Sequence, residues 1–587
     1  MKSFFKIFLA SFLALLLFSM IGFFVFLGIV SALTSADKAE TGQKAMLVID
    51  LAKTYPEIGV ENPLARLSNK DNGDIPSLYD VIRMIDYARR DSAVKGIYLK
   101  CSRNGNGFGA SEELRDALAA FKAGGKFIYA YGDVINQGGY YVANVADKLY
   151  CNPKGGVDWR GYSAQLVFVK GLLEKLQIEP QIFYAGKFKS ATEPFREKQM
   201  TDANRRQMSE LLGDLYGHFL LQTAAARKID TATLHQYANE NRIQYAEDAL
   251  QCKLVDGLKY EDEVKEEIKG RLGVENISKI NFISLGKYAK AVEFKRTGSG
   301  RDRIAVIYAQ GDIIDGKSSQ DMIGSETYRD LVRKARFDKN VKAIVIRINS
   351  GGGSALASEN IWRELSLARK DKPVVVSFGD VSASGAYYLS CNADSIFAQP
   401  TTITGSIGVF TLLPNMQKFF NNKLGITFDG VKTSPDADLF SAAKPLSESQ
   451  KRYLQNSVDS TYQDFKERVA QGRKKDIAFI DSVGQGRVWS GARALQLGLV
   501  DRLGGLSDAI ASAARLAKIS EYRLKEYPEP YNLLQQLMGG YQEQARRSAL
   551  KEELGEDGIK TWNIVKRTKQ MMGVAQARIP FEWNFEY

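Results

Sequence analysis

A serine that lies in one half of an internal repeat, and is missing from the other half, is the first candidate for chemistry. The stretch Gly379–Tyr388 reads GDVSASGAYY and Gly132–Tyr141 reads GDVINQGGYY, so Ser384 aligns with Gln137. Ser384 follows an apolar run typical of a buried strand and stands at the start of an expected helix, where backbone N–H groups are unpaired and the helix end is positive. The pattern therefore indicates a nucleophile, with a helix cap or a packing residue as the alternative.

A glycine-rich loop is the second candidate. Arg347–Ser354 reads RINSGGGS, directly after an expected strand and before the expected helix Ala355–Arg369. Three glycines let a backbone approach a ligand closely and present N–H donors, which suits an oxyanion hole or a phosphate. The nucleotide-binding patterns GxGxxG and GxxxxGK[ST] are absent from this loop. The matching loop of the first half, Lys100–Gly107, reads KCSRNGNG, so the glycine run is lost where the serine is lost.

The base that would activate Ser384 cannot readily be a histidine, because the chain has only His218 and His235, both far from the glycine-rich motifs. An aspartate, a glutamate or a neutral lysine remains. Moving a lysine pKa from about 10.4 to near 7 corresponds to roughly 4 to 5 kcal/mol of destabilisation of the ammonium, which burial can supply. The candidates are Lys187 and Lys189, which flank Phe188 and would share one face of an extended segment, and Lys432 as a weaker rival. A surface position is the alternative for all three lysines.

The elements that must position these residues come from a duplicated body. Val94–Lys100 matches Val341–Arg347 at the same offset that relates Gln137 to Ser384, and self-similarity of this kind indicates a repeat. Apolar runs alternate with helical stretches, as in an α/β fold with largely parallel strands. In the second half we expect strands at 372–378 and 395–398 and helices at 383–391 and 413–423. The expected parts are an anchor at 1–40, repeats at 41–295 and 296–520, and a C-terminal arm at 521–587, with a helix at 532–552.

The N-terminal segment Ile7–Leu33 is almost wholly apolar and is long enough to span a bilayer. A cleaved signal peptide is the alternative, but its apolar region usually has about 7 to 15 residues. Lys2 and Lys6 precede the segment and would keep that end in the cytoplasm. We therefore expect a single-pass anchor with the body outside the cytoplasm.

Charge and cysteine content exclude other classes of protein. The formal net charge is +12, but charged residues of both signs are interspersed, which favours solubility or an anionic membrane surface over nucleic-acid binding. The four cysteines form no CxxC pair, so neither a zinc site nor a disulfide scaffold is indicated, and buried free thiols are expected. We expect no cofactor and no metal.

Taken together, four motifs resemble the signal peptide peptidase A (protease IV) family in its long, duplicated form. They are the GDxxASGxYY block around Ser384, the SGGGS loop, TGSIG at Thr404–Gly408, and KFKSATEPF at Lys187–Phe195. The resemblance covers roughly residues 1–520. It implies two tandem repeats with the fold of Clp protease and crotonases, a ββα superhelix. It also implies a Ser-Lys dyad in which Ser384 of the second repeat is the nucleophile and Lys189 of the first is the general base. The backbone N–H groups of Gly353 and Gly385 would bind the oxyanion.

The same resemblance implies a function and a location. Members of the family cleave remnant signal peptides in or near a bacterial-type inner membrane, and long-form members assemble as tetramers. The expected substrates are therefore extended apolar peptides. Two alternatives stay open at this point: a crotonase-like acyl-CoA enzyme that uses the glycine loop without a nucleophile, and a non-catalytic membrane scaffold in which Ser384 merely packs.

Overall fold

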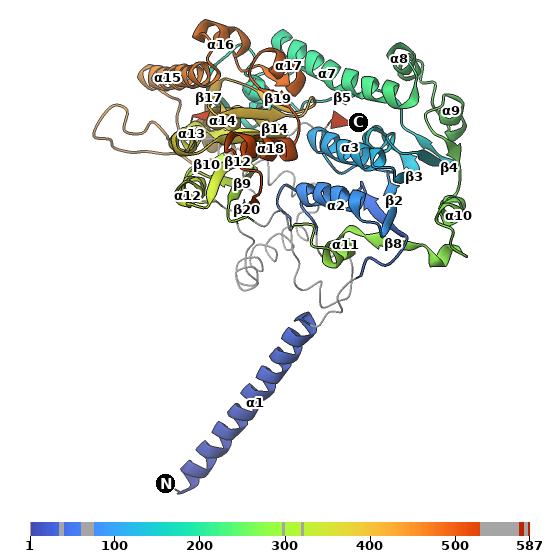
Figure 1. The fold of residues 1–587 in the computed structure, drawn as a ribbon. Helices are drawn as coiled ribbons and strands as arrows, with labels where there is room; N and C mark the ends of the chain where they lie inside the picture. Colours follow the sequence, from blue (N-terminus) through green and yellow to red (C-terminus); the bar gives the residue numbers. More distant parts are fainter. Residues whose placement is uncertain are drawn as a thin grey trace.

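The computed structural model describes residues 2–34, 40–59, 75–295, 300–318, 322–528, 575–579 and 585–586. The chain opens with one long helix, α1 (Lys2–Thr34), which projects away from the body (Figure 1). Its stretch Phe4–Val25 has a mean hydropathy of 2.5, and none of it is buried in the protein. By length and composition this helix can cross a membrane or act as a signal sequence. The expected helix at 532–552 lies outside the described residues.

The first repeat is built on a parallel sheet of six strands in the order β7-β4-β3-β2-β1-β8. The strands are β1 (Ala45–Asp50), β2 (Val94–Lys100), β3 (Phe127–Ile135), β4 (Lys148–Val157), β7 (Gly257–Leu258) and β8 (Asn281–Ser284). The helices around them are α2 (Leu78–Arg90), α3 (Phe108–Ala123), α4 (Gln137–Ala143), α7 (Asp202–Arg227), α8 (Thr231–Asn239), α9 (Ala246–Gln251), α10 (Glu261–Leu272) and α11 (Leu285–Ala291). Near-continuous apolar strands of this kind form parallel sheets that are covered on both faces.

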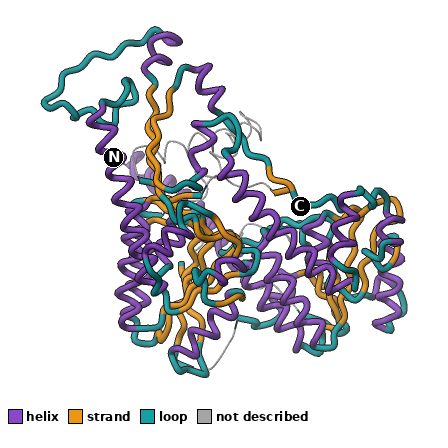
Figure 2. The backbone as a smooth tube through the Cα atoms, turned by 90° about the horizontal axis from the view of Figure 1, so that it is seen from above, coloured by secondary structure: helices purple, strands orange, loops and turns teal. Residues whose placement is uncertain are grey.

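The second repeat is built on a larger sheet whose main path is β18-β16-β14-β12-β9-β20. Its strands are β9 (Arg303–Gln310), β12 (Val341–Ser350), β14 (Val374–Ala383), β15 (Ser395–Ala398), β16 (Ile403–Gly405), β18 (Val488–Ser490), β19 (Arg502–Leu503) and β20 (Arg523–Tyr527). Its helices are α12 (Ser325–Phe337), α13 (Ala355–Asp371), α14 (Gly385–Ser390), α15 (Glu448–Arg473), α16 (Ile477–Val483), α17 (Gly491–Gln496) and α18 (Leu506–Leu516). Figure 2 shows the two repeats side by side, each with strands flanked by helices.

The duplication and the α/β class are confirmed, because β2, β3 and α4 have their counterparts in β12, β14 and α14. The expected buried free cysteines are confirmed as well. The helix expected at 413–423 begins later than predicted. The chain continues as strand β17 (Val409–Asn415), and helical turns follow at 417–424, with a π-helix at Phe419–Leu424. The strand forms because Val409–Asn415 pairs along its whole length with a strand of the first repeat, and this distant partner is not visible in the local sequence.

That pairing belongs to a third sheet, which joins the two repeats. Its order is β11-β10-β13-β21-β17-β6, with β10 (Asp312–Ile314), β11 (Met322–Gly324) and β13 (Gly352–Ser354) from the second repeat. Strand β6 (Glu179–Ala185) comes from the first repeat and runs antiparallel to β17. Strand β21 (Gln576–Arg578) comes from the C-terminal arm, and the arm also places β22 (Phe585–Glu586) against β5 (Ser163–Ala164).

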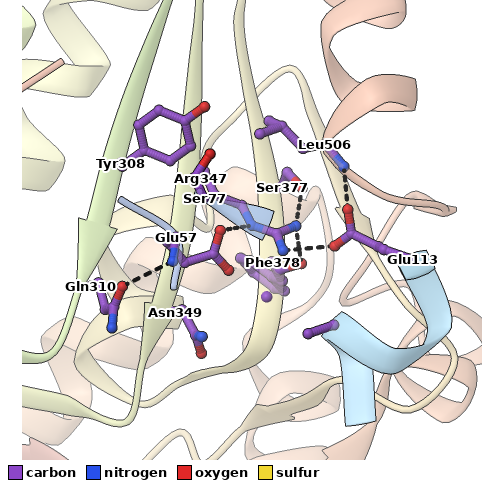
Figure 3. Close-up of polar contacts among 12 residues, drawn as sticks. Glu57, Ser77, Glu113, Tyr308, Gln310, Arg347, Asn349, Ser377, Phe378 and Leu506 are labelled. Atoms are coloured by element: carbon purple, nitrogen blue, oxygen red, sulfur yellow. Dashed lines mark hydrogen bonds and ion pairs between the residues drawn. The ribbon is translucent and has the colours of Figure 1, made fainter. Parts of the chain in front are cut away.

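The repeats are also joined in the interior by a buried ionic cluster around Arg347 of β12 (Figure 3). The guanidinium lies 2.9 Å from Glu57 and 2.6 Å from Glu113, both from the first repeat, and also donates to Ser377 Oγ and Phe378 O. Burial alone would lower the pKa of Arg347, but the two carboxylates raise it above its usual value. The arginine therefore stays charged in the interior, and the end of β12 that leads into the glycine loop is fixed to the first repeat.

Candidate active site

The structure brings Lys189 and Ser384 together. Lys189 Nζ lies 2.8 Å from Ser384 Oγ, although the first residue belongs to one repeat and the second to the other. Both side chains are buried. A serine hydroxyl within hydrogen-bond distance of an amine is the arrangement needed for proton transfer from a nucleophile to a base.

The lysine is placed by the turn that follows β6. Gly186 adopts φ +112°, a backbone conformation that favours glycine, and there the chain leaves the third sheet. Phe188 N then donates to Gln485 O at 2.7 Å, and the next turn is tightened by a bond from Lys189 N to Gly186 O. A Cβ at Gly486 would lie only 2.6 Å from Lys189 N, so a glycine is needed there for the close approach.

Helix α7 supports this lysine segment from behind. Gln207, in its second turn, donates to Phe188 O at 3.1 Å and to Ser190 Oγ at 2.8 Å. Glu193 is buried and accepts from Asn204 Nδ2 at 2.8 Å and from Thr201 Oγ1 at 2.6 Å. The segment on either side of Lys189 is thus anchored by paired polar groups, which leaves its side chain little freedom to move.

Ser384 stands in the sharp turn between β14 and α14. It adopts φ +56° and ψ −114°, which is unusual for a residue with a side chain and costs on the order of 1 to 3 kcal/mol. The turn is held on both sides, because Ser384 N donates to Gly405 O at 2.8 Å and Tyr388 N donates to Ser384 O at 2.7 Å. Strained strand-to-helix turns of this type present a nucleophile in many hydrolases.

The environment of Lys189 lowers its pKa well below the ordinary lysine value, and the cause is desolvation by burial. The groups within hydrogen-bond distance of Nζ are uncharged oxygens: Ser384 Oγ, Ser406 Oγ at 3.1 Å and Ser406 O at 3.2 Å. Loss of water without a compensating negative charge favours the neutral amine. The side chain is thereby suited to accept a proton at moderate pH.

The two rival lysines lie elsewhere. Lys187 is exposed, and its ammonium stacks over the Phe188 ring at 5.9 Å. Lys432 donates to Pro435 O and forms an ion pair with Asp438 at 3.3 Å. Of the three candidate bases, Lys189 is therefore the one beside Ser384.

Ser406 was not singled out from the sequence, although it contacts Lys189 Nζ through both its hydroxyl and its carbonyl oxygen. The signal was present in the TGSIG motif at Thr404–Gly408. A second signal is that Trp159 stands at the position of the first repeat that aligns with Ser406, so Ser406, like Ser384, is present in only one of the two repeats. Since a carbonyl oxygen can only accept, Lys189 must donate to Ser406 O.

The two glycines expected to bind an oxyanion, Gly353 and Gly385, lie close together. A Cβ at Gly385 would lie 3.2 Å from Gly353 N, and a Cβ at Gly352, which has φ +97°, would lie 2.8 Å from Gly385 N. The two backbones therefore lie next to each other beside Ser384. A Cβ at Gly352 would overlap Ala577 O and a Cβ at Gly353 would overlap Ile313 O, so these close backbone approaches account for the glycines at both positions.

The equivalent place in the first repeat is closed by other side chains. Gln137 donates from Nε2 to Gly161 O at 2.9 Å and accepts from Gly161 N at 3.0 Å. Trp159 is buried and donates to Leu234 O. The Gln137 amide, bonded to the backbone, and the packed Trp159 indole replace the serine hydroxyls, so the described part of the first repeat has no counterpart of the Ser384 site.

Comparison with known proteins agrees with this division. A family model described as Peptidase family S49 matches residues 120–275 and 366–520, one match in each repeat. The chain belongs to peptidase family S49. It is therefore a serine peptidase, and this assignment favours peptide hydrolysis over the crotonase-like and scaffold alternatives.

Relatives in family S49 match the chain over most of its length. Protease 4 of Salmonella typhi is 35% identical over 507 residues, which cover 84% of this chain and 80% of that protein. Protease 4 of Haemophilus influenzae is 35% identical over 453 residues, covering 75% of this chain and 73% of that protein. The chloroplastic serine protease SPPA of Arabidopsis thaliana is 34% identical over 463 residues, covering 77% and 68%. A ClpP1 mutant of Listeria monocytogenes is a structural match with a TM-score of 0.24 at 14% identity, covering 35% of this chain and 94% of that chain.

Proposed function

We propose that this S49 peptidase is a membrane-anchored endopeptidase that hydrolyses extended apolar peptides, including the remnants of cleaved signal peptides. Ser384 is the nucleophile and Lys189 is the general base. The observation that carries the proposal is the 2.8 Å contact between Lys189 Nζ and Ser384 Oγ, both of which are buried.

The reaction is acyl transfer. Neutral Lys189 takes the hydroxyl proton as Ser384 Oγ attacks the carbonyl carbon of the peptide, and the N–H groups of Gly353 and Gly385 bind the oxyanion that forms. The ammonium of Lys189 then gives its proton to the departing amine. Water hydrolyses the ester on Ser384 in a second step, which restores the hydroxyl. Ser406 acts as a positioning residue, because it accepts from Lys189 and directs the amine toward Ser384.

An extended peptide suits the site because β21 lies between β13 and β17 in the third sheet, and a substrate that takes the place of β21 would lie between the same two strands. A peptide added there gains backbone hydrogen bonds on both sides, while side-chain pockets select alternate residues. A relative from Enterococcus faecium, 32% identical over 253 residues (42% of this chain), carries the name "Putative signal peptide peptidase SppA", and this name supports the choice of substrate class.

The proposal also covers where the protein lies in the cell and how its copies assemble. The apolar helix α1 supports a single-pass anchor in a bacterial-type inner membrane, with the catalytic body outside the cytoplasm. Exposed apolar side chains in the segment after β17, among them Leu424, Phe428 and Val431, support contacts between copies, as in a tetramer. Light scattering of the detergent-solubilised protein measures the number of subunits.

The test is a peptidase assay on the detergent-solubilised full chain with a fluorogenic apolar peptide. The kcat/KM of Ser384→Ala and of Lys189→Ala is expected to fall by about 10²- to 10⁴-fold. Lys187→Ala and Lys432→Ala are the matched controls, because they remove lysines that lie away from Ser384. Circular dichroism verifies that each variant is folded. Normal activity of folded Lys189→Ala would show that another group is the base.

A further inference from the structure

Strand β5 of the first repeat is the counterpart of the beginning of β17, the strand that borders the active site. By the offset between the two repeats, Ser163 of β5 aligns with Phe410 of β17. At the active site, Phe410 pairs antiparallel with Gln576 of the C-terminal arm. In the first repeat, Ser163 pairs antiparallel with Glu586 of the same arm (Figure 1). The first repeat therefore has an edge that accepts an extended strand, although Gln137 stands where the second repeat has its serine.

A small pocket lies beside β5, where the first repeat meets the second. Tyr162, the residue before β5, lines the pocket together with Phe108 and Phe219, whose ring centroids lie 5.6 Å and 5.5 Å from that of Tyr162. Thr401 of the second repeat also lines it and is only 3% exposed, yet its Oγ1 has no hydrogen-bond partner among the residues that the structure describes. A buried polar atom without a partner points to a missing group, and the pocket has room for about one water-sized group. The pocket therefore suits the methyl or hydroxyl group of a small side chain.

The surface between the active site and this pocket is continuous. Ile579, which follows β21 in the arm, donates from its N–H to Gly351 O at 2.9 Å and so still contacts the glycine loop. Its side chain packs against the same apolar cluster as Phe108 and Tyr162, a cluster that includes Leu215 of α7. Helix α7 in turn packs against β5. A peptide that leaves the active site in the direction of β21 therefore passes onto the wall of the pocket and reaches β5.

We propose that the first repeat is a second peptide-binding site, in which β5 pairs with the part of a substrate that follows the cleaved bond and the pocket beside Tyr162 takes a small side chain of that part. The inference rests on the proposed function, in which the substrate takes the place of β21. Glu586 lies ten positions after Gln576 along the arm, so a substrate must extend roughly ten residues past the bond to reach β5. The peptide is held there without being cut, because Gln137 supplies no nucleophile. Long extended peptides are therefore preferred to short ones.

The first test varies the length of the substrate. Fluorogenic peptides share one apolar sequence around the cleaved bond and continue for three, six or twelve residues after it, and the detergent-solubilised full chain is the enzyme. Between six and twelve residues, kcat/KM is expected to rise about tenfold, the effect of one or two added hydrogen bonds. Equal values for these two lengths overturn the inference and leave the proposed function standing. If no peptide of the series is hydrolysed, the proposed function itself fails.

A pair of variants locates the effect. Ala164→Pro removes a backbone N–H from β5, so the ratio of kcat/KM for the twelve-residue and six-residue peptides should fall to about one. Tyr245→Ala is the matched control, because Tyr245 is an exposed residue of the first repeat that precedes α9 and should keep the wild-type ratio. A wild-type ratio in Ala164→Pro contradicts the role of β5.

A second measurement does not depend on the folding of a β5 variant. The longest peptide, with a photoreactive benzoylphenylalanine as the tenth residue after the cleaved bond, is bound to full-length Ser384→Ala, which cannot hydrolyse it. After illumination, mass spectrometry of the digested protein locates the cross-link. We expect it in residues 162–164 or in α7. A cross-link confined to the second repeat, or no cross-link in the first repeat, overturns the inference.

Discussion

Lys189 Nζ and Ser384 Oγ lie 2.8 Å apart, although the two residues are separated by 195 positions and belong to different repeats. The contact exists because β6 of the first repeat pairs with β17 of the second and delivers the lysine to the end of β14. Neither repeat contains both groups. The proposed active site therefore depends on the packing of both repeats.

The pH dependence of peptidase activity follows from the burial of Lys189. Burial lowers the pKa of its ammonium, and only the neutral amine can accept the Ser384 proton, so kcat/KM should rise with pH through this lowered pKa. The rise should be about tenfold per pH unit below the midpoint and should level off above it. Initial rates in constant-ionic-strength buffers from pH 5 to 10 measure the profile. A flat profile would mean that Lys189 is not the base.

The stability of the folded protein should respond to the same group. The pKa of Lys189 is lower in the folded chain than its value of about 10.4 in the unfolded chain. Between these two values the unfolded chain binds more protons, so stability rises with pH across that window. Lys189→Met should therefore have a higher Tm than the wild type at pH 7, and the difference should shrink by pH 9.5.

The control for this comparison is Lys187→Met, which replaces an exposed lysine two positions away. Its Tm should stay close to that of the wild type at both pH values, since exposed substitutions usually change stability by less than about 0.5 kcal/mol. If the Tm difference between Lys189→Met and the wild type is the same at pH 7 and pH 9.5, the stability does not depend on the protonation of Lys189.

Ser406→Ala should reduce activity without abolishing it. The variant removes one oxygen that contacts Lys189 Nζ and keeps the carbonyl contact, so we expect a loss of about 2- to 10-fold in kcat, the effect of one hydrogen bond. Because that oxygen stabilises the ammonium more than the neutral amine, its loss should also move the pH midpoint of activity downward. If Ser406→Ala loses activity but keeps the pH midpoint of the wild type, the substitution acts on packing alone and not on Lys189.

The ionic cluster around Arg347 should be important for stability. Arg347→Met leaves Glu57 and Glu113 buried without a positive partner, which is expected to cost about 3 to 5 kcal/mol. Thermal unfolding followed by fluorescence measures the effect. Arg206→Met is the matched control, because Arg206 pairs with Glu210 on the surface and should cost less than about 1 kcal/mol. Equal changes in the two variants would show that the cluster has no special role.

The repeat, Ser384 and the lysine segment could be predicted because a duplicated chain provides its own comparison, as when Gln137 marks the serine that was lost. The choice between Lys187 and Lys189 could not be made from alternation alone. Alternation places both on one face of an extended segment, but the chain turns at Gly186, and Lys189 precedes a 3₁₀ turn at Ser190–Thr192. Only the fold separates an exposed lysine from a buried one.

Long-range pairings were beyond local sequence patterns for a similar reason. Strand β21 has three residues, and its place is set by the backbones of β13 and β17 rather than by its own β-propensity. The partners of Arg347 are equally hidden, since Glu57 and Glu113 lie more than 200 positions before it. Such contacts appear once the two repeats are packed together.

Gln137→Ser restores the lost serine of the first repeat, and it should not create a second active site. In the part of the chain that the structure describes, the Gln137 side chain bonds to the backbone of Arg160 and Gly161 and not to a lysine, and Trp159 would still fill the place that Ser406 takes in the second repeat. The variant also removes the amide that pairs with Gly161 N and O, which should cost about 1 to 3 kcal/mol of stability. Titration with a serine-reactive fluorophosphonate should label one site per chain in the wild type and in Gln137→Ser, and none in Gln137→Ser/Ser384→Ala. Labelling of the double variant would show that the first repeat retains a working base, and that the division of roles between the repeats is incomplete.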